Sequence, residues 1–327
     1  MKKRILFLSG LIISAFFLYL ALRGIAWSEV KRSLLYMNPI WVFPATALFV
    51  PGYFLRGLRW KLILSPVKEC KTVNLISTII ISFMINNLFP LRMGELARAY
   101  IIGQKEGMSK SSALATVVME RTFDGLTLVF LFSISFLSYA LLRSVRNLRI
   151  IGGLALGTFA GVFLLILVLI HYRDSLPSRV QRLCSLLSST WAEKASHWVE
   201  SFLQGFMVIK EKRLIAYIAG CSILIWLIEG FGLYLLSRAF GLGINYPIAL
   251  SVMTISCIGI AIPAAPGYIG TYEAFVRYSL AIFSVSGNKA FSFAIFVHTL
   301  YFVLILSTGL FFLNRQRLTF SELKKNI

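Results

Sequence analysis

A short stretch in the first third of the chain combines a helix breaker with charges of both signs. Pro90 and Gly94 interrupt an apolar run, and we call this interruption the first break. Arg92, Glu95 and Arg98 lie in or just after it. Proline removes a backbone donor and disfavours helix in the preceding residue, so a helix is predicted to end and restart here. A restarted helix presents amide groups that, together with arginine, suit an anion such as a phosphate.

A similar pattern recurs far downstream, and we call it the second break. Pro266 and Gly267 begin it, and Gly270 completes the same Pro-x-x-x-Gly spacing. Glu273 and Arg277 follow, as glutamate and arginine follow the first break. We expect the two broken segments to meet inside a membrane and to form one site. The glutamate after each break can balance the arginines of an empty site, or accept a cationic headgroup or a proton. The alternative is a chance similarity between two short patterns.

Charged residues also interrupt two later apolar runs. Glu120 and Asp124 are four residues apart and share a helix face, and Arg121 is spaced to pair with Asp124. Glu229 lies inside another apolar run. Charges at the centre of a bilayer are costly, so they usually pair and face the protein interior. The first three residues are therefore either substrate contacts or a structural ion-pair cluster. Glu229 either faces the cavity or hydrogen-bonds a neighbouring helix as a protonated acid.

Other polar side chains near the breaks have two interpretations as well. Asn86 and Asn87 close the apolar run before the first break, and Asn87 is predicted to contact the substrate. Arg98 and Arg277 either bind the substrate or extend to the lipid headgroups. Three tyrosines near the breaks are more typical of interface anchors than of ligands: Tyr100, Tyr272 and Tyr278.

The composition indicates an integral membrane protein. Of 327 residues, 58% are hydrophobic and 14% are charged, and the mean hydropathy is +0.80. Soluble globular domains carry about 25% charged residues. The net charge of +20 does not indicate nucleic acid here, because the basic residues lie mostly at the ends of apolar runs. That placement is typical of polytopic proteins, whose cytoplasmic loops are rich in lysine and arginine.

The sequence carries little that predicts a metal, a cofactor or a catalytic centre. The four cysteines are isolated from one another, without a Cys-x-x-Cys pair, and the three histidines are scattered. No phosphate-cradling glycine-rich loop and no Asp-x-Asp motif of sugar-nucleotide enzymes is present. We therefore assign no catalytic residue, metal or cofactor, and the pattern favours a transporter over an enzyme.

The hydrophobic pattern predicts an all-α polytopic protein that forms a single membrane domain over residues 1–327. A run of about 20 apolar residues crosses a bilayer as a helix. We expect about six full spans, two re-entrant broken-helix hairpins and, from the similarity of the hairpins, an inverted-repeat arrangement. The expected full spans are 5–22, 39–55, 109–142, 150–170, 214–236 and 290–313. The expected hairpins are 73–102 and 246–283.

The distribution of basic residues predicts that both termini are cytoplasmic, in the inner membrane of a prokaryote. Five basic residues between 56 and 71 are assigned to a cytoplasmic loop: Arg56, Arg59, Lys61, Lys68 and Lys71. A second cytoplasmic loop is expected at 173–213, where aromatic and aliphatic residues recur at helical spacing. That spacing predicts an amphipathic helix on the membrane surface. The first hairpin then enters from the cytoplasm, an assignment that depends on Lys105 and Lys110, and the second enters from outside.

The order and spacing of these charged and helix-breaking residues resemble one family over nearly the whole chain. The residues that carry the resemblance are Pro90, Gly94, Glu95, Arg98, Glu120, Arg121, Asp124, Pro266, Gly267, Gly270 and Glu273. They are similar to the lysylphosphatidylglycerol synthase membrane-domain family, also called flippase-like. The resemblance implies movement of a lipid between leaflets. The synthases of this family add a soluble aminoacyl-transferase domain, which does not follow here, so the resemblance implies translocation rather than lysine transfer.

The predicted function is therefore a translocase for an anionic or zwitterionic phospholipid or for a polyprenyl-phosphate-linked lipid. The expected partners are the membrane lipid itself and an enzyme of lipid or glycan synthesis. One alternative is a membrane-embedded lipid-modifying transferase, similar to a phosphatidylglycerol lysyltransferase or associated with a glycosyltransferase. Another is an accessory subunit of such an enzyme.

Overall fold

The computed structural model describes residues 2–90, 92–142, 211–262 and 264–326, together with 153, 154, 157, 161 and 164. All regular elements in these parts of the chain are helical, which confirms the predicted all-α class. The expected span 150–170 and the expected loop 173–213, with its amphipathic helix, lie almost wholly outside the described residues.

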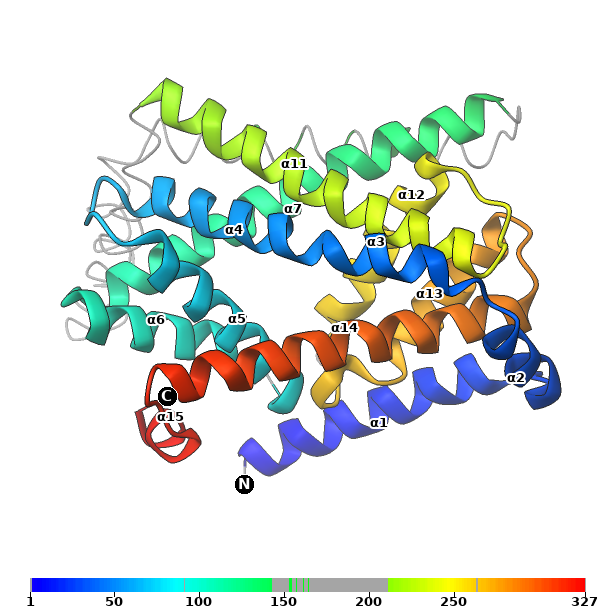
Figure 1. The fold of residues 1–327 in the computed structure, drawn as a ribbon, viewed down its shortest axis with the longest axis horizontal. Coiled ribbons are helices and arrows are strands. Elements are labelled where there is room, and N and C mark those ends of the chain that lie inside the picture. The colour runs from blue at the N-terminus through cyan, green and yellow to red at the C-terminus, as the bar shows by residue number, and fades with distance from the viewer. Residues whose placement is uncertain are drawn as a thin grey trace, which may run out of the picture.

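The helices of the first part of the chain end at α7, and those of the second part begin at α11 (Figure 1). The first part contains α1 (Lys2–Leu22), α2 (Trp27–Leu35), the 3-10 helix η1 (Pro39–Trp41), α3 (Val42–Ala47), α4 (Phe49–Leu64), α5 (Thr72–Leu88), α6 (Met93–Glu106) and α7 (Lys110–Leu142). The second part contains α11 (Lys212–Ala239), α12 (Tyr246–Ala261), the 3-10 helix η3 (Pro266–Tyr268), α13 (Thr271–Ile282), α14 (Gly287–Arg315) and α15 (Phe320–Asn326).

Two of the described helices are long and apolar enough to cross a bilayer on their own, namely 213–239 and 287–315. A third candidate is the pair formed by 9–22 and 27–35, which is bent by 83° at the short connection between its helices. The helices α5 and α12 are apolar but shorter. By length and composition the described residues therefore contain two or three spans, and the expected number of six stays a prediction.

Both breaks divide a helical hairpin, as the sequence predicts. The first break separates α5 from α6, which pack against each other, and the second separates α12 from α13, which do the same. In Figure 1 the start of α5, the end of α6 and both chain termini lie towards the left of the view. The start of α12 and the end of α13 lie towards the right. The two hairpins thus enter the bundle from opposite ends.

The expected loop between 56 and 71 is wrong in its first part. Helix α4 continues to Leu64, so Arg56 and Arg59 lie within it and only the residues after it form a connection. Their side chains are 4% and 0% exposed. Both arginines find carboxylate partners on α7 or α11, and such pairing is what allows a charge inside an apolar bundle. The expected span 39–55 is divided among η1, α3 and the start of α4, and it stays a prediction.

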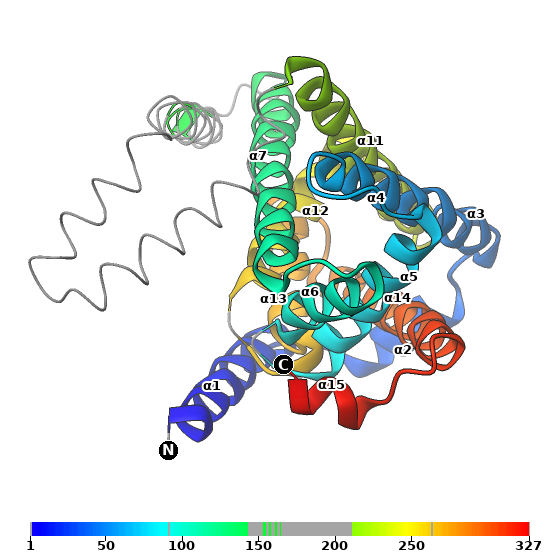
Figure 2. The same ribbon diagram turned by 90° about the vertical axis from the view of Figure 1, so that its left-hand side faces the viewer.

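Helix α14 connects the two hairpins. It packs against α5 of the first hairpin and against α13 of the second. Gly309 faces Met84 of α5 so closely that a Cβ at this glycine would meet the methionine side chain. The first helix, α1, packs against α13, and Figure 2 shows it at the edge of the bundle, away from α4 and α11. The two hairpins are therefore joined to each other through α14.

Candidate functional site

The first break brings α6 back onto α5 at very close range. Arg92 adopts a left-handed backbone conformation with φ 52°, and α6 begins at the next residue. The amide of Gly94 donates to Asn86 Oδ1 at 2.8 Å. A Cβ at Gly94 would collide with the carbonyl oxygen of Ser82 on α5. Only glycine permits this approach, so Gly94 determines how the restarted helix meets the first one.

The second break is built on two glycines with positive φ. Gly267 has φ 72° inside η3, and Gly270 has φ 90° just before α13. Glu273 Oε2 accepts a hydrogen bond from the amide of Gly270 at 2.7 Å, which satisfies a free donor at the helix start. Helix α1 also contacts the second break, because Ser14 Oγ accepts a hydrogen bond from the amide of Ala265 at 2.9 Å.

The two breaks meet, as expected from the sequence. Arg92 Nη2 donates to the carbonyl oxygen of Ile260, in the last turn of α12, at 3.3 Å. Gly267 faces the carbonyl oxygen of Asn87, and α5 packs against η3. The ends of two hairpins from opposite sides of the bundle are thus in direct contact.

A cavity of about 460 Å³ lies beside this junction, between α4, α5, α7, α11, α12 and α14. Its wall is amphipathic. The apolar part includes Leu48, Phe83, Leu128, Ile260 and Phe302. The polar part includes Tyr53, Arg56, Asn86, Asn87, Arg92, Glu95, Arg121, Asp124, Glu229, Tyr268, Tyr272, His298 and Tyr301.

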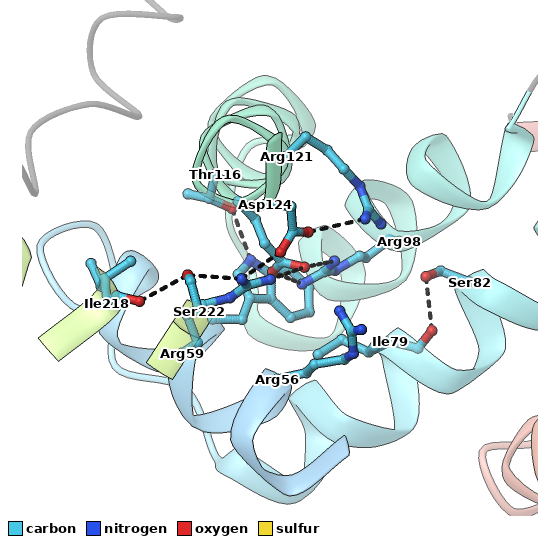
Figure 3. Close-up of polar contacts among 12 residues, drawn as sticks. Arg56, Arg59, Ile79, Ser82, Arg98, Thr116, Arg121, Asp124, Ile218 and Ser222 are labelled. Carbon is cyan, nitrogen blue, oxygen red and sulfur yellow. Dashed lines mark hydrogen bonds and ion pairs between the residues drawn. The ribbon is translucent and has the colours of Figure 1, made fainter. Parts of the chain in front are cut away.

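A group of four charged residues, Arg59, Arg98, Glu120 and Asp124, lies next to the cavity, and we call it the buried quartet. Of these four, only Asp124 also lines the cavity. Arg98 donates from both terminal nitrogens to the two oxygens of Glu120, at 3.0 and 2.6 Å. Arg59 pairs with Glu120 at 3.1 Å and with Asp124 at 2.6 Å. All four side chains are at most 5% exposed. Figure 3 shows Arg59, Arg98 and Asp124 converging with their interactions dashed.

The buried quartet is balanced in charge and well supplied with neutral partners. Its two arginines offset its two carboxylates. Ser222 Oγ accepts from Arg59 at 2.9 Å, and Trp226 Nε1 donates to Asp124 at 3.1 Å. The guanidinium of Arg98 lies 3.6 Å from the centre of the Trp60 ring. The quartet therefore ties α4, α6, α7 and α11 together, and its geometry favours the structural interpretation of Glu120.

A second group of charges faces the cavity. Arg121 pairs with Glu95 at 3.1 Å and with Asp124 at 3.2 Å, and Arg92 lies 3.9 Å from Glu95. Arg56 pairs with Glu229. The side chains of Arg92 and Glu229 are 40% and 39% exposed, respectively. Asp124 also lines the cavity but is counted with the quartet, which is neutral as a whole. The other cavity-facing charges are three arginines (Arg56, Arg92, Arg121) and two carboxylates (Glu95, Glu229), so they leave one net positive charge.

Arg56 is a polar residue of the cavity that the sequence interpretation missed. Its guanidinium lies 5.6 Å from the ring centre of Phe83 and 5.3 Å from that of Trp226, besides its pair with Glu229. Its Nε atom has no hydrogen-bond partner within the described part of the chain. The signal was present in the sequence, because Arg56 and Arg59 are three residues apart and share a face of an extended α4.

The structure sorts the predicted site residues into four groups. Six line the cavity: Asn87, Arg92, Glu95, Arg121, Asp124 and Glu229. Five shape the breaks: Pro90, Gly94, Pro266, Gly267 and Gly270. Arg98 and Glu120 belong to the buried quartet and do not line the cavity, so substrate contact by these two stays a prediction that the geometry does not favour. Glu273 and Arg277 hold other elements at the second break.

Arg277 does not line the cavity but binds the end of α1. Its guanidinium donates to the carbonyl oxygens of Leu20 and Ala21 at 3.0 and 2.6 Å, and to that of Arg23 at 2.9 Å. These carbonyls lack helical partners at the end of α1, so the arginine completes the hydrogen bonding there. The geometry favours a structural role for Arg277, and its two sequence interpretations stay predictions.

The three tyrosines that the sequence suggests as interface anchors differ in exposure and location. Tyr100 is only 5% exposed and lies under the ammonium of Lys110, 4.5 Å from its ring centre. Tyr272 lines the cavity. Tyr278 is 48% exposed and donates to the carbonyl oxygen of Leu20 at 3.2 Å. Only Tyr278 has the exposure expected of an anchor.

Known protein families and proteins match most of this chain. The profile of the "Lysylphosphatidylglycerol synthase TM region" matches residues 7–309. A "UPF0104 membrane protein" of Methanothermobacter thermautotrophicus is 27% identical over 276 residues, which cover 80% of this chain and 82% of the relative. The "UPF0104 membrane protein MJ1078" of Methanocaldococcus jannaschii is 25% identical over 245 residues, covering 73% and 97%.

A further relative carries an enzyme name. The "Glycosyltransferase AglD" of Haloferax volcanii is 24% identical over 327 residues, which cover 90% of this chain but only 52% of AglD. No solved structure matches the chain. The profile match spans both broken hairpins, the buried quartet and the cavity wall. The chain therefore belongs to the family of the lysylphosphatidylglycerol synthase transmembrane region.

Proposed function

We propose that this protein moves a phosphate-bearing membrane lipid between leaflets and that the cavity holds the lipid headgroup. The observation that carries the proposal is the net positive charge of the cavity-facing group at the contact of the two breaks. A phosphate would offset that charge. The substrate class is an anionic or zwitterionic phospholipid or a polyprenyl-phosphate-linked lipid.

The size and chemistry of the cavity suit a headgroup rather than a whole lipid. A volume of about 460 Å³ falls in the range of small-molecule sites, which are roughly 300–1,000 Å³. Arginine binds phosphate oxygens through two parallel hydrogen bonds, and Arg92 and Arg121 both line the wall. The apolar residues beside them can receive the first carbons of the lipid. The acyl chains would stay in the surrounding bilayer.

The arrangement of the hairpins supports movement across the membrane. Transporters with inverted repeats often place their substrate between broken helices near the midplane, where one repeat rocks against the other. Here the hairpins enter from opposite ends of the bundle (Figure 1). They touch where Arg92 donates to the carbonyl oxygen of Ile260. Rocking of one hairpin against the other would open the cavity to each leaflet in turn.

The basic residues at the helix ends favour a cytoplasmic position for both termini. The end of the bundle with the termini also carries Lys61, Lys68, Lys71, Lys105, Lys110, Lys212, Arg213, Arg315, Arg317, Lys324 and Lys325. The opposite end carries Arg23, Lys31, Arg32, Arg238 and Lys289. Under the positive-inside rule, this distribution supports a first hairpin that enters from the cytoplasm and a second that enters from outside, in an inner membrane.

Replacement of Arg92 by glutamine is expected to slow lipid exchange by about ten- to hundred-fold. A hydrogen bond to a charged group contributes about 1.5–3 kcal/mol, and about 1.4 kcal/mol corresponds to a factor of ten. Arg92 is 40% exposed and lies 3.9 Å from Glu95, so its loss leaves no fully buried charge without a partner. The measurement is leaflet exchange of headgroup-labelled phospholipids in proteoliposomes, followed with a membrane-impermeant quencher.

Lys289 provides the matched control for this test. It is an exposed basic residue at the start of α14, and its replacement by glutamine removes the same charge from outside the cavity. Exchange is expected to stay at the level of the wild type. Equal exchange rates for the wild type, Arg92→Gln and protein-free vesicles, across anionic and zwitterionic lipids, would contradict the proposed function.

A second candidate is suggested by the similarity to the glycosyltransferase AglD, namely handling of a lipid-linked sugar for a transferase or as part of one. The carboxylates available for such chemistry are Glu95 and Glu229, because they face the cavity. Turnover of a glycosyl or aminoacyl donor by the purified protein, abolished in Glu229→Gln, would favour this candidate over translocation. Copurification with a transferase and exchange only in its presence would indicate an accessory subunit.

A further inference from the structure

The two breaks differ in the groups that neutralise the glutamate behind each of them. Glu95, after the first break, lies between Arg92 and Arg121, at 3.9 and 3.1 Å. Glu273, after the second break, has one ion-pair partner among the described residues, which is His298. The distance between His298 Nδ1 and Glu273 Oε1 is 2.5 Å. Arginine keeps its charge at every physiological pH, whereas histidine gains or loses its charge between about pH 5 and 8 in water.

The pair of Glu273 and His298 can be reached from the cavity and joins two helices, so binding of a proton can change how these helices are held together. His298 is 16% exposed and lines the cavity, so water in the cavity can reach its ring. Glu273 uses its other oxygen to hold the amide of Gly270 at the start of α13. The imidazole belongs to α14 and the carboxylate to α13. One interaction therefore joins the second hairpin to the helix that also packs against α5 of the first.

We infer that Glu273 and His298 form a proton-binding site that couples movement of the second hairpin, and with it the lipid, to a proton gradient. The inference rests on the proposed function. A proton from cavity water adds to the imidazole, so a hydrogen bond between neutral imidazole and carboxylate becomes an ion pair between imidazolium and carboxylate, and the net charge of the pair changes from −1 to zero. Release of the proton to water reverses the step, and no other reactant is needed. The proton-bound state holds α13 firmly to α14, and the proton-free state loosens the contact.

The other titratable groups around His298 do not offer the same gain of positive charge on binding a proton. Helix α5, which packs against α14, carries no titratable side chain. Tyr272 on α13, Tyr301 on α14 and Cys257 on α12 are neutral acids in water up to about pH 8. Glu229 on α11 is paired with Arg56.

Helix α2 also packs against α14, and its charged residues are Glu29, Lys31 and Arg32. Glu29 accepts from Asn288, near the start of α14 and ten positions before His298. The lysine and arginine carry permanent charge at neutral pH. His298 is therefore the proton-accepting side chain of this neighbourhood that both lines the cavity and contacts Glu273.

The test compares lipid exchange in proteoliposomes with and without an imposed pH gradient. For the wild type, the gradient is expected to raise the exchange rate several-fold, and the rate at equal pH on both sides is expected to depend on that pH. In His298→Gln both effects are lost, so the ratio of rates with and without the gradient falls to one. Glu273→Gln is expected to lose the gradient effect too, while its amide oxygen can still accept from Gly270.

Two controls separate this inference from a folding defect and from the proposed function. The other histidines, His171 and His197, are replaced together by glutamine, and this double variant is expected to keep the gradient effect. Melting temperatures report whether each variant is folded, and Glu273→Gln replaces His298→Gln as the decisive variant if the latter unfolds. A gradient effect that persists in the folded variant overturns the inference. Wild-type exchange that ignores the gradient overturns the coupling alone, whereas no exchange under any condition overturns the proposed function.

Discussion

Replacement of Glu120 by glutamine is expected to lower the free energy of unfolding by about 3–5 kcal/mol. Glu120 is fully buried and carries the negative charge that both Arg98 and Arg59 contact, at 2.6 and 3.1 Å. The amide keeps the shape of the carboxylate but not its charge, so the buried quartet would hold two arginines against one carboxylate. The measurement is thermal or denaturant unfolding in detergent or in proteoliposomes.

A double variant distinguishes the charge imbalance from a simple loss of packing. Arg98→Met combined with Glu120→Gln removes one charge of each sign and leaves Arg59 with Asp124, which are 2.6 Å apart. This double variant is expected to recover a large part of the lost stability. The control, Glu69→Gln, lies in the exposed connection before α5 and should change stability by about 0.5 kcal/mol or less. Wild-type stability with abolished lipid exchange in Glu120→Gln would instead show that this carboxylate acts on the substrate.

Replacement of Gly94 by alanine is expected to cost about 3 kcal/mol of stability and to abolish lipid exchange. Overpacking in a well-packed interior typically costs about 1–3 kcal/mol, and the upper end applies where backbone blocks the new atom. Here the added methyl group would meet the carbonyl oxygen of Ser82 and the side chain of Asn86. Helix α6 would have to move away from α5, and Glu95 would leave its position in the cavity wall. Unfolding curves and exchange rates measure the two effects.

Gly220 offers the matched control for this substitution. It lies in the middle of α11, and a Cβ at this position would meet no atom within 4 Å. Alanine is favoured over glycine inside a helix by about 1 kcal/mol, so Gly220→Ala is expected to be neutral or stabilising. Equal behaviour of the two alanine variants would mean that α6 does not approach α5 as closely as described.

The two hairpins are held by different kinds of interaction. The first hairpin is fixed through Arg98 of α6 to the buried quartet, which reaches α4, α7 and α11. The second has one ion pair among the described residues, Glu273 with His298, and is otherwise held by hydrogen bonds. These include the bonds of Ser14 and Arg277 with α1 and of Ser251 with Ser135 on α7. If the protein moves a lipid as proposed, this contrast favours the second hairpin as the part that moves.

Local sequence patterns determined much of this architecture. The helix breaks at Pro90 and Pro266 could be predicted because proline and glycine act on the backbone of their immediate neighbours, whatever the rest of the fold does. The long helix at 109–142 followed from apolar residues at helical spacing. The family could be predicted as well, because it depends on motif residues in order along the chain, and the profile match confirms it. The number of spans depends on the membrane and on residues outside the described part.

The tertiary structure alone decided which charges face the cavity. Arg59 finds Asp124 across 65 positions, and Arg56 finds Glu229 across 173. An arginine is buried at acceptable cost only where a carboxylate pairs with it. Without knowledge of those partners, the basic residues after position 55 look like a cytoplasmic loop. The role of His298 could not be predicted from the sequence for the same reason, since Glu273, the carboxylate that it contacts, lies on another helix. The sequence determined where the helices break and which charges lie in apolar surroundings, and packing decided which of them pair and which stay open to a substrate.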